Sequence, residues 1–209
     1  FMSWPFLAVI FSGWIYVDAA YRGPKWQGWI FKPITMLLLL LWAWQGPEMT
    51  TFSYLILFGL LASLVADIIQ MLPTERMLYT IGALFISHLL YTLYFANPLK
   101  LSFYWPLILV LFAVGVAIVL LLWNQLEDMR WPVATYIAVT LLMVWVAAES
   151  YLTQPGDMSF SQLAGSILLL IANIIWLTNR YRISFKAANG IIAVCYFLGH
   201  FMIVRSLHI

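Results

Sequence analysis

The sequence predicts an all-α integral membrane protein, a polytopic bundle of eight transmembrane helices that forms a single domain over residues 1–209. Of these 209 residues, 65% are apolar and only 9% are charged. An ordinary soluble domain carries about a quarter charged residues. The apolar residues also come in runs of about twenty, the length at which a helix crosses roughly 30 Å of hydrocarbon.

Breaks at glycine, proline and charged residues divide the chain into eight apolar runs. In order they span residues 2–20, 30–45, 52–72, 77–96, 102–123, 132–152, 161–178 and 187–205. Eleven Trp and eleven Tyr fit such helices, because these rings collect at the two headgroup levels of a bilayer. The connections are short, so any chemistry must take place between the helices.

Basic residues distinguish the two sides of the membrane. The connections after the first, third, fifth and seventh runs hold Arg22, Lys25, Arg76, Arg130, Arg180, Arg182 and Lys186. The opposite side holds Lys100 and Arg205. Cytoplasmic loops retain basic residues during insertion, so we expect both termini on the periplasmic side of a bacterial inner membrane.

Two segments of the chain suggest an internal repeat. Residues 64–69 read LVADII and residues 170–175 read LIANII, while FISH at 85–88 resembles FLGH at 197–200. The repeats would be 1–100 and 101–209, two parallel four-helix units related by an axis along the membrane normal. Asp67 and Asn173 would then lie at equal depth. The alternative is a chance match within a strongly biased composition.

Asp67 is the first candidate for chemistry, because a carboxylate inside an apolar helix costs a few kcal/mol and usually marks function. His88 and Tyr91 lie one turn apart on one face, which places an imidazole beside a phenol. Tyr196 and His200 repeat that spacing in reverse order. Structural histidines with satisfied hydrogen bonds are the alternative for both pairs.

Three further charged positions have simpler interpretations. Lys32 could extend its long stem to water, or its ammonium could bind a lipid phosphate or balance Asp67. Asp18 and Arg22 are four residues apart, so we expect a local ion pair. Glu149 lies near the opposite interface, where we expect it to reach water in a structural role.

Taken in order, these landmarks resemble the YhhN family of eight-pass membrane proteins over essentially the whole chain. The resemblance rests on Phe31-Lys32-Pro33, Asp67 in a small-residue stretch, Ser87-His88-Leu89-Leu90-Tyr91, and Tyr196 with Ile203. Characterised animal members are lysoplasmalogenases. The resemblance thus implies hydrolysis of the vinyl ether bond of lysoplasmalogens to a fatty aldehyde and a glycerophospho-base, without a known cofactor.

The resemblance also implies a catalytic pair of intramembrane aspartates. This chain matches the first at Asp67, but the second position, usually a Ser-Asp pair, reads Ala172-Asn173, and His200 stands where those enzymes commonly have glutamine. We therefore expect little or no hydrolysis by the natural chain.

Vinyl ether hydrolysis needs one acid and one base. A carboxyl group in apolar surroundings tends to hold its proton, which suits Asp67 as the acid. Asn173 could orient water, His88 is the replacement base, and Tyr91, Tyr196, His200 and Lys32 would bind the lysophospholipid.

A lipid or small-metabolite transporter or binding protein is the alternative function. We expect no nucleic-acid partner, because a net charge of +2 forms no basic stripe. We also expect no metal site, because a zinc hydrolase would want three histidines on facing helices and only two lie inside the runs.

Overall fold

The computed structural model describes residues 4–46, 50–72, 76–96 and 102–209. The described part of the chain is helical and contains no β-strand, which confirms the all-α prediction. In chain order the helices are α1 (Trp4–Tyr21), α2 (Lys25–Trp44), α3 (Thr51–Met71), α4 (Met77–Ala96), α5 (Trp105–Leu126), α6 (Arg130–Thr153), α7 (Asp157–Tyr181) and α8 (Ala188–Arg205), with 3-10 turns η1 (Glu127–Met129) and η2 (Ser206–His208). Lys100 lies outside the described residues.

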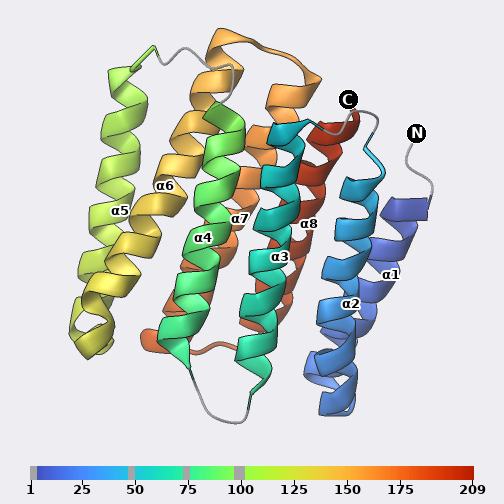
Figure 1. Ribbon diagram of the computed structural model, residues 1–209. Helices are drawn as coiled ribbons and strands as arrows, with labels where there is room; N and C mark the ends of the chain where they lie inside the picture. The colour runs from blue at the N-terminus through green and yellow to red at the C-terminus, as the bar shows by residue number, and fades with distance from the viewer. Residues whose placement is uncertain (1–3, 47–49, 73–75, 97–101) are drawn as a thin grey trace.

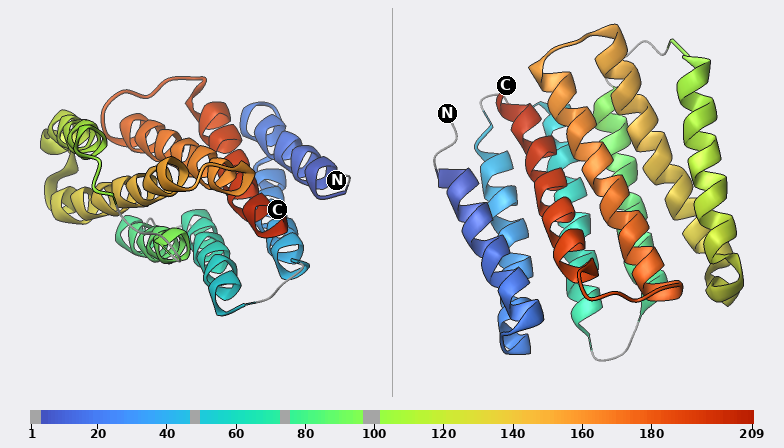
Figure 2. Two further views of the ribbon diagram at one scale, coloured as in Figure 1. Left: turned by 90° about the horizontal axis from the view of Figure 1, so that it is seen from above. Right: turned by 180° about the vertical axis from the view of Figure 1, so that it is seen from behind.

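The helices run alongside one another in a bundle with α1 and α5 at opposite edges (Figure 1). The pairs α1–α2, α3–α4, α5–α6 and α7–α8 pack together, and α4 also packs on α6 as α8 packs on α1 and α2. The start of α1 and the end of α8 lie at the same end of the bundle (Figure 2). The helices are therefore placed for a polar centre shared by α3, α4, α7 and α8.

Six segments of the described chain are long and apolar enough to cross a membrane. They are Trp26–Trp44, Thr51–Met71, Met77–Ala96, Trp105–Thr153, Asp157–Tyr181 and Ala188–His208. One of them contains both α5 and α6, and α1 is not among them. These apolar helices agree with the membrane class expected from composition.

Several helices extend past the predicted apolar runs. α2 begins at Lys25 instead of residue 30, and α7 begins at Asp157 instead of residue 161. The hydrocarbon sets the apolar length of a crossing, whereas backbone hydrogen bonding can continue into the headgroup region.

The bundle buries a set of polar side chains within an apolar core and exposes apolar side chains on its surface. Buried positions hold serine, threonine, histidine and acidic side chains, while Trp14, Phe112 and Trp131 are 70–73% exposed. Lipid tails accept exposed apolar side chains, whereas polar groups at membrane depth must find partners inside the protein. The structure thus has the surface of a membrane protein and concentrates its chemistry internally.

α5 has little contact with the rest of the bundle. Its buried residues are Gly115, Ile118, Leu122 and Leu126. Near its C-terminal end, Arg182 donates to the Leu121 carbonyl at 3.3 Å and Arg130 donates to the Trp123 carbonyl at 2.9 Å. Polar contacts therefore hold this end of α5.

Glu149 on α6 holds the other end of α5. Its carboxylate accepts from the backbone N–H groups of Ser102 and Tyr104, each at 2.9 Å, from the Ser102 hydroxyl, and from the Trp145 indole at 3.3 Å. The expectation that Glu149 reaches water is wrong, because its side chain is fully buried. The reason is that the N–H groups before α5 satisfy the carboxylate inside the protein.

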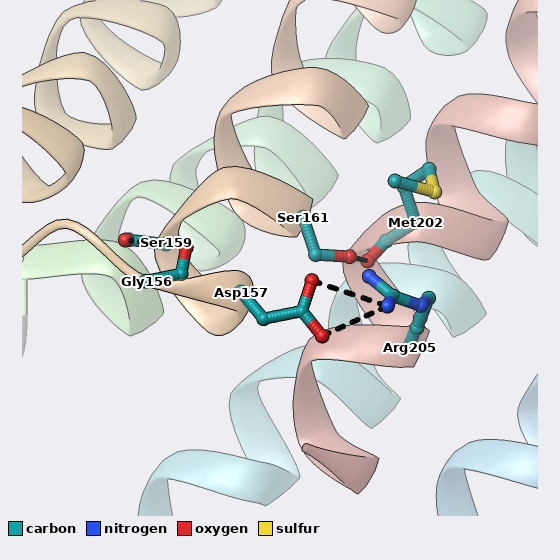
Figure 3. A network of polar contacts seen from close by, with 6 residues as sticks. All are labelled: Gly156, Asp157, Ser159, Ser161, Met202 and Arg205. Atoms are coloured by element: carbon teal, nitrogen blue, oxygen red, sulfur yellow. Dashed lines mark hydrogen bonds and ion pairs between the residues drawn. The ribbon is translucent and has the colours of Figure 1, made fainter.

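A further polar clamp joins α7 to α8 (Figure 3). Arg205 donates to both carboxylate oxygens of Asp157, at 3.0 and 3.2 Å, and the Ser161 hydroxyl donates to the Met202 carbonyl at 2.5 Å. These contacts fix the first turns of α7 against the last turns of α8. The expected Asp18–Arg22 pair is present at the end of α1, at 2.7 Å.

Candidate functional site

Asp67 lies one turn before the end of α3 and is 2% exposed. Its Oδ1 accepts a hydrogen bond from the Tyr196 phenol of α8 at 3.1 Å and lies 3.5 Å from the Lys32 ammonium of α2. Its Oδ2 is buried and has no hydrogen-bond partner among the described residues. Both donors therefore occupy one carboxyl oxygen and leave the other free.

Lys32 turns its ammonium toward Asp67 and into the bundle. Besides Asp67, its Nζ donates to Gln70 Oε1 at 3.1 Å. The same nitrogen lies 5.7 Å from the centre of the Tyr16 ring and 5.4 Å from that of Tyr196, within cation–π range. Sequence reasoning missed Tyr16 and Gln70. Gln70 follows Asp67 by three residues, a spacing that places both on one helix face.

Two cavities meet at the Lys32–Asp67 pair. The first, which we call the α7–α8 cavity, measures about 160 Å³ and is lined by Asp67, Asn173, Trp176 and Tyr196 among others. The second, the α1–α2 cavity, measures about 280 Å³ and is lined by Tyr16, Ala19, Gly28, Trp29, Gln70 and Met71 together with Lys32 and Asp67. Lys32 lines the α7–α8 cavity as well. The pair thus faces two spaces at once.

Asn173 on α7 is buried and is held by side chains of two other helices. Its Nδ2 lies 3.0 Å from His88 Nε2 of α4 and 3.4 Å from Thr140 Oγ1 of α6. The His88 ring also meets the edge of the Tyr136 ring, with 5.3 Å between ring centres. The structure therefore places His88 behind Asn173, in contact with the amide, and gives it no contact with Asp67 among the described residues.

Tyr91 and His200 form a third polar contact, between α4 and α8. The Tyr91 hydroxyl lies 2.8 Å from His200 Nδ1, and both side chains are fully buried. Gly59 makes room for the Tyr91 ring, because a Cβ there would lie 2.5 Å from a ring carbon. The His200 ring packs edge-on against Tyr196, with 4.5 Å between centres. The two pairs expected within single helices, His88–Tyr91 and Tyr196–His200, are thus joined by the contact between Tyr91 and His200.

The seven predicted site residues divide into three contacting groups. Lys32, Tyr196 and Asp67 form the charged group, and His88 with Asn173 forms the neutral group. Tyr91 and His200 form the third group, and the His200 ring packs against Tyr196 of the charged group. Asp67 and Asn173 come together because both line the α7–α8 cavity.

Comparison with known proteins places this arrangement in a family. The profile of the YhhN family matches residues 27–207. Proteins named "Uncharacterized membrane protein YhhN" from Escherichia coli O6:H1, Escherichia coli O157:H7 and Shigella flexneri are each 52% identical to the chain over 208 residues, which covers 100% of this chain and 100% of theirs. No solved structure gives a significant match. With a match over most of its length and relatives that align from end to end, the chain belongs to the YhhN family of membrane proteins.

Proposed function

We propose that this chain is an intramembrane lipid hydrolase of the lysoplasmalogenase type, with Asp67 as the proton donor and Asn173 in the place of a second carboxyl. The observation that carries the proposal is that Asp67 and Asn173 line one cavity between α3, α7 and α8. A lipid segment in this cavity would lie between the two side chains.

The hydrogen bonds of Asp67 leave one carboxyl oxygen open for the role of an acid, and its burial favours the protonated form. Tyr196 and Lys32 both approach Oδ1, so a proton on the carboxyl group would reside on Oδ2. From there it can pass to the alkene carbon that is not bonded to the ether oxygen, which leaves an oxocarbenium ion. Water then adds to this cation and gives up its own proton, and the resulting hemiacetal collapses to a fatty aldehyde and the free glycerol hydroxyl.

The base is the weaker half of the proposed site. The amide of Asn173 can hold water but cannot take its proton. His88 is the proposed base, yet its Nε2 already lies 3.0 Å from the Asn173 amide, so proton transfer to His88 would require this contact to open. This geometry supports slow hydrolysis by the natural chain.

The test is aldehyde release from lysoplasmenylcholine and lysoplasmenylethanolamine by the purified protein in detergent. Asn173→Asp restores a carboxyl base beside His88 and should raise the rate about tenfold or more. Asp67→Asn should remove whatever activity is present. Robust turnover by the natural protein that Asp67→Asn leaves unchanged would refute the proposal.

Binding of a lipid or metabolite without hydrolysis, or its transport, is the second candidate. It is favoured by Asn173, whose amide is already paired with His88 and Thr140 and offers no base. Protein-dependent movement of a lipid between liposomes, with no aldehyde formed from lysoplasmenyl lipids by the natural chain or Asn173→Asp, would support it.

The proposal includes eight crossings of a bacterial inner membrane, in two parallel repeats, with both termini in the periplasm. The packing of α3 on α4 matches that of α7 on α8, and α8 contacts α2, over a smaller area, where α4 contacts α6, which supports the repeat. Basic residues at the opposite end of the bundle support the orientation. Alkaline phosphatase fused after Ile209 should be active, whereas a fluorescent cytoplasmic reporter at that site would contradict the orientation.

A further inference from the structure

Lys32 is the one cation among the described residues that line either the α7–α8 cavity or the α1–α2 cavity. An anionic ligand that enters this part of the bundle must therefore be neutralised by Lys32. An ammonium has three N–H donors, and the described oxygen partners of Lys32 are Gln70 and Asp67. A donor remains for a third oxygen.

We infer that the α1–α2 cavity is a headgroup site, in which Lys32 binds the phosphate of a single-chain phospholipid and exchanges its contact with Asp67 for that phosphate. This inference rests on the proposed function for the class of lipid and for the direction in which it lies, and it adds the place of the headgroup and the contact that Lys32 exchanges.

The position of the cavity supports a headgroup. It lies among the last turns of α1 and α3 and the first turns of α2. Asp67 is four residues before Met71, where α3 ends, or roughly 6 Å along the helix axis at 1.5 Å per residue. A phosphate on Lys32 would thus lie near the membrane surface, with its glycerol beside Asp67 and its chain directed into the α7–α8 cavity.

The size of the α7–α8 cavity supports a single chain. Its volume is about 160 Å³, below the roughly 300 Å³ at which pockets for drug-sized ligands begin. Such a space takes one short chain segment next to the reacting bond.

The contacts of Lys32 support the exchange. The ammonium lies closer to the neutral oxygen of Gln70, at 3.1 Å, than to the carboxylate of Asp67, at 3.5 Å. Phosphate carries a negative charge and several strong acceptor oxygens, so it competes for the same N–H donors. Gln70 can keep its hydrogen bond to Lys32 while the phosphate replaces Asp67.

Binding can be separated from hydrolysis with ester-linked lysophosphatidylcholine, which has no vinyl ether. Its affinity in detergent should exceed that of a monoacylglycerol with the same chain by about five- to tenfold, the contribution of about 1 kcal/mol from one lysine at a membrane surface. Lys32→Met should abolish this preference and Lys32→Arg should keep it. Equal affinity of the natural protein for the two lipids would overturn the inference.

Gly28→Leu tests the cavity without changing any charge. A Cβ on Gly28 would lie 3.7 Å from the Tyr16 ring, an ordinary contact, so the helix accepts a side chain that fills the α1–α2 cavity. Gly82→Leu is the matched control, because no atom lies within 4 Å of a Cβ there. Gly28→Leu should lose the phosphate preference and Gly82→Leu should retain it, and this pair decides the question even if Lys32→Met fails to fold.

Asp67→Asn tests the exchange itself. If Asp67 competes with the ligand for Lys32, this variant should bind lysophosphatidylcholine about fivefold more tightly than the natural chain. Weaker binding would show that Asp67 and phosphate do not compete. Inorganic phosphate and glycerophosphocholine distinguish a lipid from a free phosphate compound, and stabilisation by either as large as that by the lysolipid would overturn the assignment to a lipid. Failure of hydrolysis with this binding pattern intact would refute only the proposed function.

Discussion

Residues 64–69 and 170–175 carry nearly the same string, yet the structure surrounds their central residues with opposite chemistry. Asp67 contacts an ammonium and a phenol and faces two cavities. Asn173 contacts an imidazole and a hydroxyl and faces one of those cavities. The surroundings of Asp67 are therefore charged, and those of Asn173 are neutral.

Asp67 and Asn173 differ by one heavy atom, a carboxyl oxygen in place of an amide nitrogen. This difference changes which groups can pair with the side chain. An ionised carboxylate only accepts hydrogen bonds, so it requires donors such as Lys32 and Tyr196. An amide both donates and accepts, so Asn173 can satisfy His88 and Thr140 without a counter-ion. Similar helices can thus serve as a charged centre and as a neutral wall of the same cavity.

Exchanging the two side chains is the strongest test of this comparison. The double variant Asp67→Asn, Asn173→Asp keeps one carboxyl and one amide, but it moves the carboxyl away from Lys32 and Tyr196. We expect its aldehyde release to fall at least about a hundredfold below that of Asn173→Asp alone, the usual effect of losing a placed acid. The aldehyde is measured by mass spectrometry. Equal rates in the two variants would show that positions 67 and 173 are interchangeable.

Removal of His88 tests the neutral surroundings of Asn173. His88→Leu leaves the buried amide of Asn173 with only the 3.4 Å contact to Thr140, so the free energy of unfolding should fall by about 1–2 kcal/mol. Unfolding in mixed detergent would measure this change. In a double-mutant cycle with Asn173→Leu, the coupling should be about 0.6 kcal/mol or more. Simple additivity of the two substitutions would mean that the contact contributes nothing.

The ends of the helices should matter least. Arg205→Gln removes the pair with Asp157, whose side chain is 58% exposed, and the free energy of unfolding should fall by less than about 1 kcal/mol. The same unfolding assay applies, with no change in lysolipid binding. A loss as large as that of His88→Leu would mean that the ion pair at the helix ends stabilises the fold as much as the buried His88–Asn173 contact.

The helices were predictable because each apolar run has about the length of a helix that crosses a membrane. Several members of the polar centre were predictable as well, since Asp67, His88 and Asn173 stand out against apolar neighbours. Their pairing was not, because the sequence spacing joins His88 to Tyr91, while the fold turns His88 toward Asn173 of α7 and Tyr91 toward His200 of α8.

Tyr16 and Gln70 were not predicted, for a different reason. Near the ends of helices, a tyrosine or glutamine reads as an ordinary interfacial residue, and only the approach of Lys32 gives each a role. The backbone N–H groups that pair with Glu149 lie 45 and 47 residues earlier in the chain. Spacing patterns relate residues only a few positions apart, so they could not predict these contacts.

The attachment of α5 at both ends has a consequence for the response of the protein to its bilayer. α5 has 22 residues, roughly 33 Å of helix, close to the thickness of the hydrocarbon. A helix with a free end answers hydrophobic mismatch by tilting. α5 cannot tilt alone, because Glu149 of α6 holds the segment before it and Arg130 and Arg182 hold its last turns. We therefore expect a thicker or thinner membrane to tilt α5 together with α6 and α7, so that the apolar cavity of about 440 Å³ between α5 and α6 keeps its shape.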